Sequence, residues 1–229
     1  MKKVLIIVVG LGIISSTLYF VLKNDKQTIT SELKRTIVCP SPWDEKWANP
    51  ENSEIKNSRT IYYVSNSVGN DSNSGLSANA PWKTLKKVNG NSFLPGDAVL
   101  FKRGDSWNGT LVPTSSGEAG KPILFGAYGD EKERPIIENT HFRQDVVVDI
   151  TGKNYLTFNN LDIRNAKHGI WILNSDFIIL DHMSIGFNVN ETGIIINDGS
   201  DNGIIQYSLI DGGTELESKQ ARYDQFSRW

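Results

Sequence analysis

The stretch GNDSNSGLSANAPWKTLKKVN (Gly69–Asn89) begins with the alternating pattern Asp71-x-Asn73-x-Gly75. Such a pattern is typical of loops that bind calcium through carboxylate, amide and carbonyl oxygens. An EF-hand loop has glycine directly after its third ligand and glutamate at its twelfth position, whereas here glycine is fifth and Trp82 is twelfth. The spacing excludes an EF-hand site, so these residues are better explained as turn formers that lead into a short helix.

The composition indicates an ordinary globular chain of 229 residues, 38% hydrophobic and 22% charged, long enough for one sizeable core. A net charge of -2 argues against nucleic-acid binding, which usually requires a basic face. Cys39 is the only cysteine, so the chain has neither an intrachain disulfide nor a zinc site built from several thiolates. We expect a monomer.

The first 23 residues are predicted to be a targeting segment. Lys2 and Lys3 precede an uncharged run of nineteen residues, Val4–Leu22, which is just long enough to span a bilayer. No cleavage site of the A-x-A kind follows, so we expect an uncleaved signal anchor, with a cleaved signal peptide as the alternative. The paired lysines place the rest of the chain outside the cytoplasm, either membrane-anchored or secreted. Residues 24–58 are interpreted as a polar linker.

From the segment YLTF onward, the chain is a series of short apolar strands separated by two to six polar residues. Leu161, Met183 and Leu209 occupy corresponding positions 22 and 26 residues apart, and Gly169 and Gly193 lie 24 residues apart. A period in the low twenties with three strands in each repeat predicts a parallel β-helix, in which successive coils stack on one another. A leucine-rich repeat is the main alternative, but its consensus and its helical return segment are absent.

The period-two rule for strands predicts which side chains of these coils face the core. The inward set contains two stacked groups: Leu161, Ile163, Ile170 and Ile172, then Met183, Ile185, Ile194 and Ile196. The alternate residues are expected to face outward: Asp162, Arg164, Trp171, Ser184 and Ile195.

A solenoid needs a lid over its first coil, and residues 59–110 are predicted to provide it. The expected cap helix starts with Pro81 in its first turn and presents an apolar stripe of Trp82, Leu85 and Val88. Within the same region, Arg103 and Asp105 are expected to form an ion pair. Residues 111–213 are predicted to form the coils, and residues 214–229 an irregular or truncated tail.

Three segments together resemble the N-terminal part of secreted bacterial right-handed parallel β-helix proteins of the pectate-lyase-like superfamily: GNDSNSGLSANAPWKTLKKVN, LPGDAVLFKRGDSWNG and SGEAGKPILFGAYG followed by RPII. The resemblance extends from Ile61 to about Gly213. It implies an all-β fold with three-strand coils and an N-terminal cap that contains a short helix. Members of the superfamily include lyases and hydrolases of acidic polysaccharides and also proteins with no assigned reaction, so the resemblance implies the fold more than the chemistry.

In that superfamily, substrate lies along one outer sheet, which here contains GIWILN and GIIIND and is flanked by the loops AKHG and VNETG. The candidate residues on or beside that sheet are Lys167 and His168 as catalytic groups, Trp171, Arg164 and Asn197 as substrate-binding groups, and Glu191 and Asp198 as metal ligands. None of them lies in a catalytic signature of the superfamily, so their roles are expectations from position and chemistry.

The chemistry best matched to these candidates is β-elimination at the uronic acids of an acidic polysaccharide. This reaction removes a proton next to a carboxylate, so it needs a base and a cation that neutralises the sugar acid. Lys167 and His168 are suited to be base and positive charge, and calcium (Ca2+) held by Glu191 and Asp198 is a second source of charge. The alternatives are a glycoside hydrolase, which uses paired carboxylates, and a non-catalytic, surface-anchored β-helix that binds carbohydrate.

The same side chains also have plain structural interpretations. Lys167 and His168 lie in a tight turn, where polar residues are expected in any case. Trp171 would serve equally as an aromatic cover for the sheet. His182 follows Asp181 in another two-residue turn and is expected to stack beneath Asn160 rather than to act in catalysis.

Overall fold

The computed structural model describes residues 58–140, 146–186, 189–197, 199–210, 221–223 and 227–228. It gives the backbone but not the side chains of residues 189–191, 221–223 and 227–228. The predicted targeting segment, residues 1–23, lies outside the described residues. Within those ranges no helix is both long enough and apolar enough to cross a membrane.

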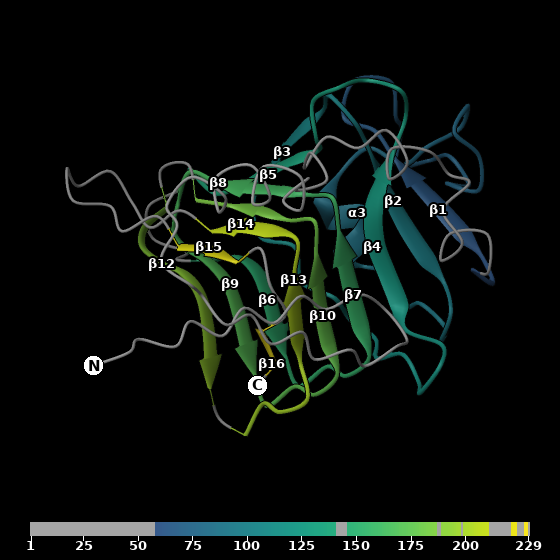
Figure 1. Ribbon diagram of the computed structural model, residues 1–229. Helices are drawn as coiled ribbons and strands as arrows, with labels where there is room; N and C mark the ends of the chain where they lie inside the picture. Colours follow the sequence, from purple (N-terminus) through teal and green to yellow (C-terminus); the bar gives the residue numbers. More distant parts are fainter. Residues whose placement is uncertain are drawn as a thin grey trace, which may run out of the picture. The chain divides into compact units, whose positions relative to one another are not determined.

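The described strands form three sheets (Figure 1). The seven-stranded sheet contains, in spatial order, β1 (Ile61–Val64), β2 (Ala98–Lys102), β4 (Ile123–Tyr128), β7 (Leu156–Asn159), β10 (Ile178–Asp181), β13 (Ile204–Gln206) and β16 (Ser227–Arg228). The six-stranded sheet contains β15 (Ala221–Tyr223), β14 (Ser208–Ile210), β11 (Ser184–Ile185), β8 (Asp162–Arg164), β5 (Ile136–Glu138) and β3 (Ser106–Asn108). The three-stranded sheet contains β12 (Val189–Asn197), β9 (Ala166–Leu173) and β6 (Val146–Thr151).

From β4 to β12 the chain visits the three sheets in turn, so that three successive coils each contribute one strand to each sheet. Coils stack through parallel pairs such as β7 with β10 and β9 with β12, and they complete about 4 turns. The prediction of an all-β parallel β-helix with little helix is therefore confirmed. At one end of the two larger sheets the pairing becomes antiparallel: β16 pairs with β13, and β15 pairs with β14.

These two strands occupy five of the residues 214–229, and the rest of that range lies outside the described residues, so the prediction of an irregular or truncated tail stays a prediction. An edge strand presents unpaired N–H and C=O groups, which pair readily with any extended segment that reaches them.

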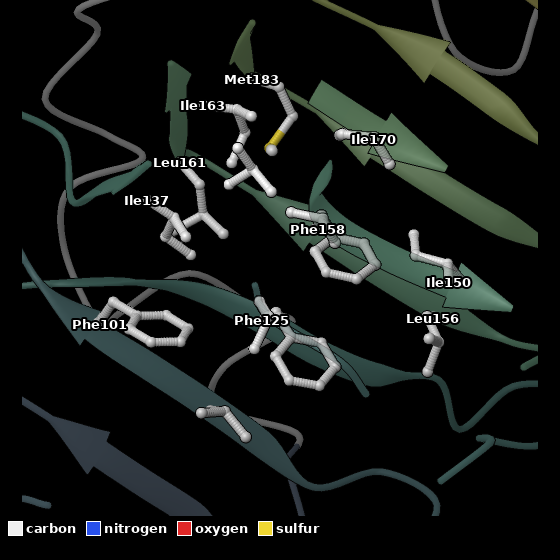
Figure 2. Packing of buried hydrophobic residues seen from close by; sticks show 14 of the residues in the cluster. Phe101, Phe125, Ile137, Ile150, Leu156, Phe158, Leu161, Ile163, Ile170 and Met183 are labelled. Atoms are coloured by element: carbon white, nitrogen blue, oxygen red, sulfur yellow. The ribbon is translucent and has the colours of Figure 1, made fainter. Parts of the chain in front are cut away.

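The core consists of aliphatic and aromatic side chains stacked along the axis of the solenoid. Phe125 and Phe158 lie in neighbouring coils (Figure 2). Their rings are stacked, with centroids 5.1 Å apart and planes 11° apart. Ile163 stands in register with Ile185, and both are buried. The predicted inward set is buried as expected, except that Ile194 and Ile196 of β12, the end strand of the three-stranded sheet, are only half-buried. The period-two rule thus predicts the interior correctly.

Single left-handed residues turn the chain from the seven-stranded to the six-stranded sheet. Asn160, His182 and Tyr207 occupy this corner in successive coils, with φ of 62, 50 and 48°. The backbone N–H of Asn160 donates to the carbonyl of Asp181, and the N–H of His182 donates to that of Gln206. His182 therefore stacks beneath Asn160, as expected. Its Nδ1 lies 2.7 Å from Asp181 Oδ1, and both residues are buried.

The cap helix, α3 (Leu85–Asn89), begins later than predicted. Thr84 is its N-cap, with an extended backbone (φ -114, ψ 153) and an Oγ1 that accepts a hydrogen bond from the N–H of Lys87. Pro81 and Trp82 precede the helix, and Trp82 makes a parallel bridge with Val64. The prediction that Pro81 lies in the first helical turn is therefore wrong, although Leu85 and Val88 do bury against the core as expected.

The Asp71 carboxylate holds this segment extended up to the N-cap. Its Oδ1 accepts hydrogen bonds from the N–H groups of Lys83 (2.8 Å) and Thr84 (3.0 Å), and its Oδ2 accepts one from Thr84 Oγ1 (2.7 Å). Partial burial acts to raise the pKa of Asp71, but these hydrogen bonds favour the charged form more strongly, so the pKa is lowered overall. Asp71 is therefore a structural acceptor, which agrees with the exclusion of a calcium loop.

The expected ion pair between Arg103 and Asp105 is also absent. Arg103 donates from Nη1 to the carbonyl of Lys132 (3.1 Å). Asp105 accepts from Ser65 Oγ (2.7 Å) and from the N–H of Ser67 (3.1 Å). Both buried side chains bond to groups from other segments, which two-residue spacing in the sequence does not reveal, although Arg103 Nε finds no acceptor among the described residues.

Candidate functional site

The candidate site is the outer face of the three-stranded sheet. Parallel pairing aligns Asp149 of β6 with Trp171 of β9, and Trp171 with Ile195 of β12. Thr151, Leu173 and Asn197 form the next aligned row on the same face. We call these six residues the outer face.

The interior of the same strands fixes this orientation. Ile170 and Ile172, which flank Trp171 in the chain, are fully buried, so Trp171 must point away from the core. Gly169 permits the close approach of β9 and β12, because a Cβ there would lie 2.4 Å from the carbonyl oxygen of Gly193. Buried isoleucines and one close glycine contact therefore position the tryptophan from behind.

His168 and Trp171, two of the candidate residues, lie close together. Their ring centroids lie 5.7 Å apart with the planes tilted by 42°, and both residues are half-buried. Trp171 Nε1 is buried and finds no hydrogen-bond acceptor among the described residues. Lys167 precedes His168 in β9 and is also half-buried. The catalytic roles of Lys167 and His168 stay predictions.

Arg164 belongs to a different sheet from Trp171. It lies on β8 of the six-stranded sheet and forms an ion pair with Asp162, two residues earlier on the same strand. Only Asn165 separates β8 from β9, so Arg164 stands near the corner beside the outer face. Its charge is balanced locally, which weakens its expected role in neutralising a substrate.

The predicted metal ligands fall where the structure gives no side-chain position. Glu191 has only its backbone described, and Asp198 lies outside the described residues. Among the residues with described side chains, no group of three or more His, Cys, Asp or Glu could hold a metal ion. Calcium binding therefore stays a prediction. Asn197 is exposed at the end of β12, on the outer face as expected.

Asp149 is the charged outer-face residue that sequence reasoning missed. It is half-buried, aligns with Trp171, and accepts a hydrogen bond from Thr151 Oγ1. A signal was present, because Asp149 is the single charged residue in the β-branched run VVVDIT. Asp149 is a candidate because it aligns with Trp171. The sequence pattern alone did not predict this alignment for the coil that contains β6.

Comparison with known proteins finds a sequence relative that matches about half of this chain. A lacto-N-biosidase from Bifidobacterium longum subsp. longum is 35% identical over 146 residues, which cover 53% of this chain and 9% of that protein. The chain thus spans less than a tenth of the relative's length. No family model matches the chain.

Several solved structures share the architecture. The native GH136 lacto-N-biosidase from Eubacterium ramulus is 24% identical, with a TM-score of 0.54 over 65% of this chain and 33% of that chain. The pectate lyase Pel9A is 23% identical, with a TM-score of 0.55 over 66% and 39% of the two chains. An alginate lyase from Paenibacillus sp. str. FPU-7 is 19% identical, with a TM-score of 0.50 over 64% and 44%. The chain therefore has the pectate-lyase-like parallel β-helix fold, as the resemblance implied.

Proposed function

We propose that this chain is part of a carbohydrate-active β-helix protein and that its outer face binds a glycan. The observation that carries the proposal is Trp171, a half-buried tryptophan held outward between two buried isoleucines. A tryptophan offers a large, flat apolar surface with low conformational entropy, which suits contact with the C–H face of a sugar ring. The hydroxyl, amide and carboxyl groups of Thr151, Asn197 and Asp149 supply polar partners on the same face.

Two comparisons support carbohydrate as the ligand class. The sequence relative is named for action on an oligosaccharide, and the structural neighbours are named as a biosidase, a pectate lyase and an alginate lyase. The structural neighbours are similar to this chain in fold, and the sequence relative adds 35% identity.

For the reaction, we favour glycoside hydrolysis, because the sequence relative that is 35% identical over 146 residues is a lacto-N-biosidase. Hydrolysis usually requires two carboxyl groups that flank the scissile bond. Asp149 supplies one candidate carboxylate on the outer face. Elimination at the uronic acids of an acidic polysaccharide is the second candidate, with Lys167 and His168 as base and charge beside Trp171 and with calcium held by Glu191 and Asp198.

The proposed setting is extracytoplasmic, with a monomeric chain anchored or exported by residues 1–23. This proposal rests on the paired lysines and the uncharged run Val4–Leu22. Fractionation of cells that express the chain, followed by protease treatment of intact cells, tests it. The chain is expected in the membrane fraction or the medium and to be cleaved from outside.

Isothermal titration calorimetry tests whether the outer face binds a glycan. The 229-residue chain is titrated with a panel of neutral and acidic oligosaccharides. Trp171→Ala is expected to weaken binding about fivefold or more, since stacking of a nucleobase on an aromatic side chain contributes about 1–3 kcal/mol and a sugar ring offers a similar flat face. Phe177→Ala is the matched control, because Phe177 is 41% exposed and lies outside the three-stranded sheet. Absence of binding to any panel member, or equal effects of the two substitutions, would overturn the proposal.

The two reactions are separated on the same samples. Elimination creates unsaturated uronate ends that absorb in the ultraviolet, whereas hydrolysis releases saturated sugars with new reducing ends. Pectate and alginate with calcium serve as lyase substrates, and neutral oligosaccharides serve as hydrolase substrates.

A further inference from the structure

We propose that Asp149 and Trp171 form a subsite that accepts an uncharged sugar ring and disfavours a uronate. This inference rests on the proposed glycan-binding function and narrows the substrate class of that site. Its basis is the register of β6 and β9, which sets a carboxylate directly beside the aromatic platform.

The geometry brings both side chains to one bound sugar. Aligned residues on neighbouring strands are about 4.8 Å apart, close to the width of a single pyranose ring. Both side chains are half-buried and face away from the core, since Val148 and Ile150 on either side of Asp149 are fully buried. A ring stacked on Trp171 would therefore place its hydroxyl groups within reach of Asp149.

The Asp149 carboxylate has accepting capacity to spare. Its Oδ1 accepts a hydrogen bond from Thr151 Oγ1, and its Oδ2 accepts none from the described residues. An ionised carboxylate is an acceptor only, so it suits the hydroxyl donors of a neutral sugar. Charge-assisted hydrogen bonds of this kind are stronger than neutral ones.

The same carboxylate repels a uronate. Two like charges at such short separation interact unfavourably, and a bound acid would need a nearby cation to compensate. Lys167 lies four residues before Trp171, about 13 Å of extended strand away, and Arg164 is already paired with Asp162. His168, whose ring centroid lies 5.7 Å from that of Trp171, offers a positive charge only when it is protonated. The aligned residue on the other side of Trp171 is Ile195, which is uncharged.

The test is calorimetric titration of the 229-residue chain with lacto-N-biose and with digalacturonate, at low and at high ionic strength. The wild-type chain is expected to prefer the neutral disaccharide at least tenfold at low ionic strength. Asp149→Asn removes the charge and keeps the shape of the side chain. It should weaken the binding of lacto-N-biose several-fold and strengthen the binding of digalacturonate several-fold. The preference for the neutral disaccharide should then fall to less than threefold. High salt should also reduce the wild-type preference, because it screens the repulsion.

Asp130→Asn is the control, since Asp130 is an exposed carboxylate on the loop after β4 and outside the three-stranded sheet. Circular dichroism checks that each variant is folded. Equal wild-type affinity for the two disaccharides, or an unchanged preference in Asp149→Asn, would overturn the subsite even if Trp171→Ala abolished binding. Failure of the wild-type chain to bind either sugar, by contrast, would count against the glycan-binding function itself.

Discussion

The tryptophans of the cap and the tryptophan of the outer face are held in different ways. Trp82 and Trp107 are each only 4% exposed. Trp82 donates from Nε1 to the carbonyl of Asn73 (3.1 Å), and Trp107 donates to that of Lys83 (2.8 Å). Trp171 is half-buried, and its Nε1 has no acceptor among the described residues.

The difference separates a structural from a binding use of the same residue type. A buried tryptophan with a satisfied N–H contributes its area and its hydrogen bond to folding. A tryptophan that faces outward, with a carboxylate aligned beside it, contributes much less to folding and leaves ring surface for a ligand. Substitutions at the two places should therefore affect stability and binding in opposite proportions.

The largest expected effect on stability is that of Trp82→Ala. Trp82 stacks on Tyr62 with centroids 4.9 Å apart, and it packs so closely under Gly75 that a Cβ there would lie 2.5 Å from its ring. Its removal should lower the free energy of unfolding by about 3–5 kcal/mol. Urea denaturation followed by circular dichroism measures this, and a loss below about 1 kcal/mol would show that the cap is not essential to the fold.

Gly169→Ala should have the next largest effect and tests the support behind the outer face. The added methyl group would meet the carbonyl oxygen of Gly193 at 2.4 Å and Ile185 Cγ2 at 2.9 Å. Overpacking of this kind costs about 1–3 kcal/mol. Gly152→Ala is an informative comparison, because a Cβ at Gly152 meets nothing within 4 Å, although its φ of 65° adds backbone strain. Equal unfolding midpoints for the wild-type and Gly169→Ala chains would refute the close packing.

Asp71→Ala should cost about 1–2 kcal/mol at pH 7, since the N–H groups of Lys83 and Thr84 and the Thr84 hydroxyl lose their acceptor. The pKa of Asp71 is lowered in the folded protein, so its contribution is present above the unfolded pKa of about 4 and is lost as the pH falls through the folded pKa. The difference in stability between the wild-type and variant chains should therefore shrink on acidification. A difference that stays constant from pH 7 to strongly acidic conditions would contradict the charged-carboxylate account.

The smallest expected effect on stability is that of Trp171→Ala, at about 1 kcal/mol or less, because the side chain is half-buried and has no hydrogen bond to lose. Glycan binding should fall about fivefold or more in the same variant. A loss of stability as large as that of Trp82→Ala would show that Trp171 has a structural role like that of the cap tryptophans, and it would contradict the proposed difference between them.

Period-two alternation predicted the interior of the coils, because burial on one face of a strand leaves a local pattern. Contacts between distant segments were not predictable in the same way. The start of α3 depends on Asp71, which lies 13 residues before Thr84, and Asp105 accepts from Ser65, 40 residues earlier. Asp149 becomes a candidate site residue only because it aligns with Trp171, which lies on the next coil.

The most direct test of the glycan face is a titration that observes the tryptophans individually. The chain has 6 tryptophans, so 15N labelling gives a small set of indole N–H signals, which Trp→Phe variants can assign. On addition of a neutral oligosaccharide such as lacto-N-biose, the signal of Trp171 should shift in a saturable way while those of Trp82 and Trp107 stay in place. Saturable shifts confined to the cap tryptophans, or an unchanged Trp171 signal while calorimetry reports binding, would contradict the assignment of the outer face as the glycan-binding surface.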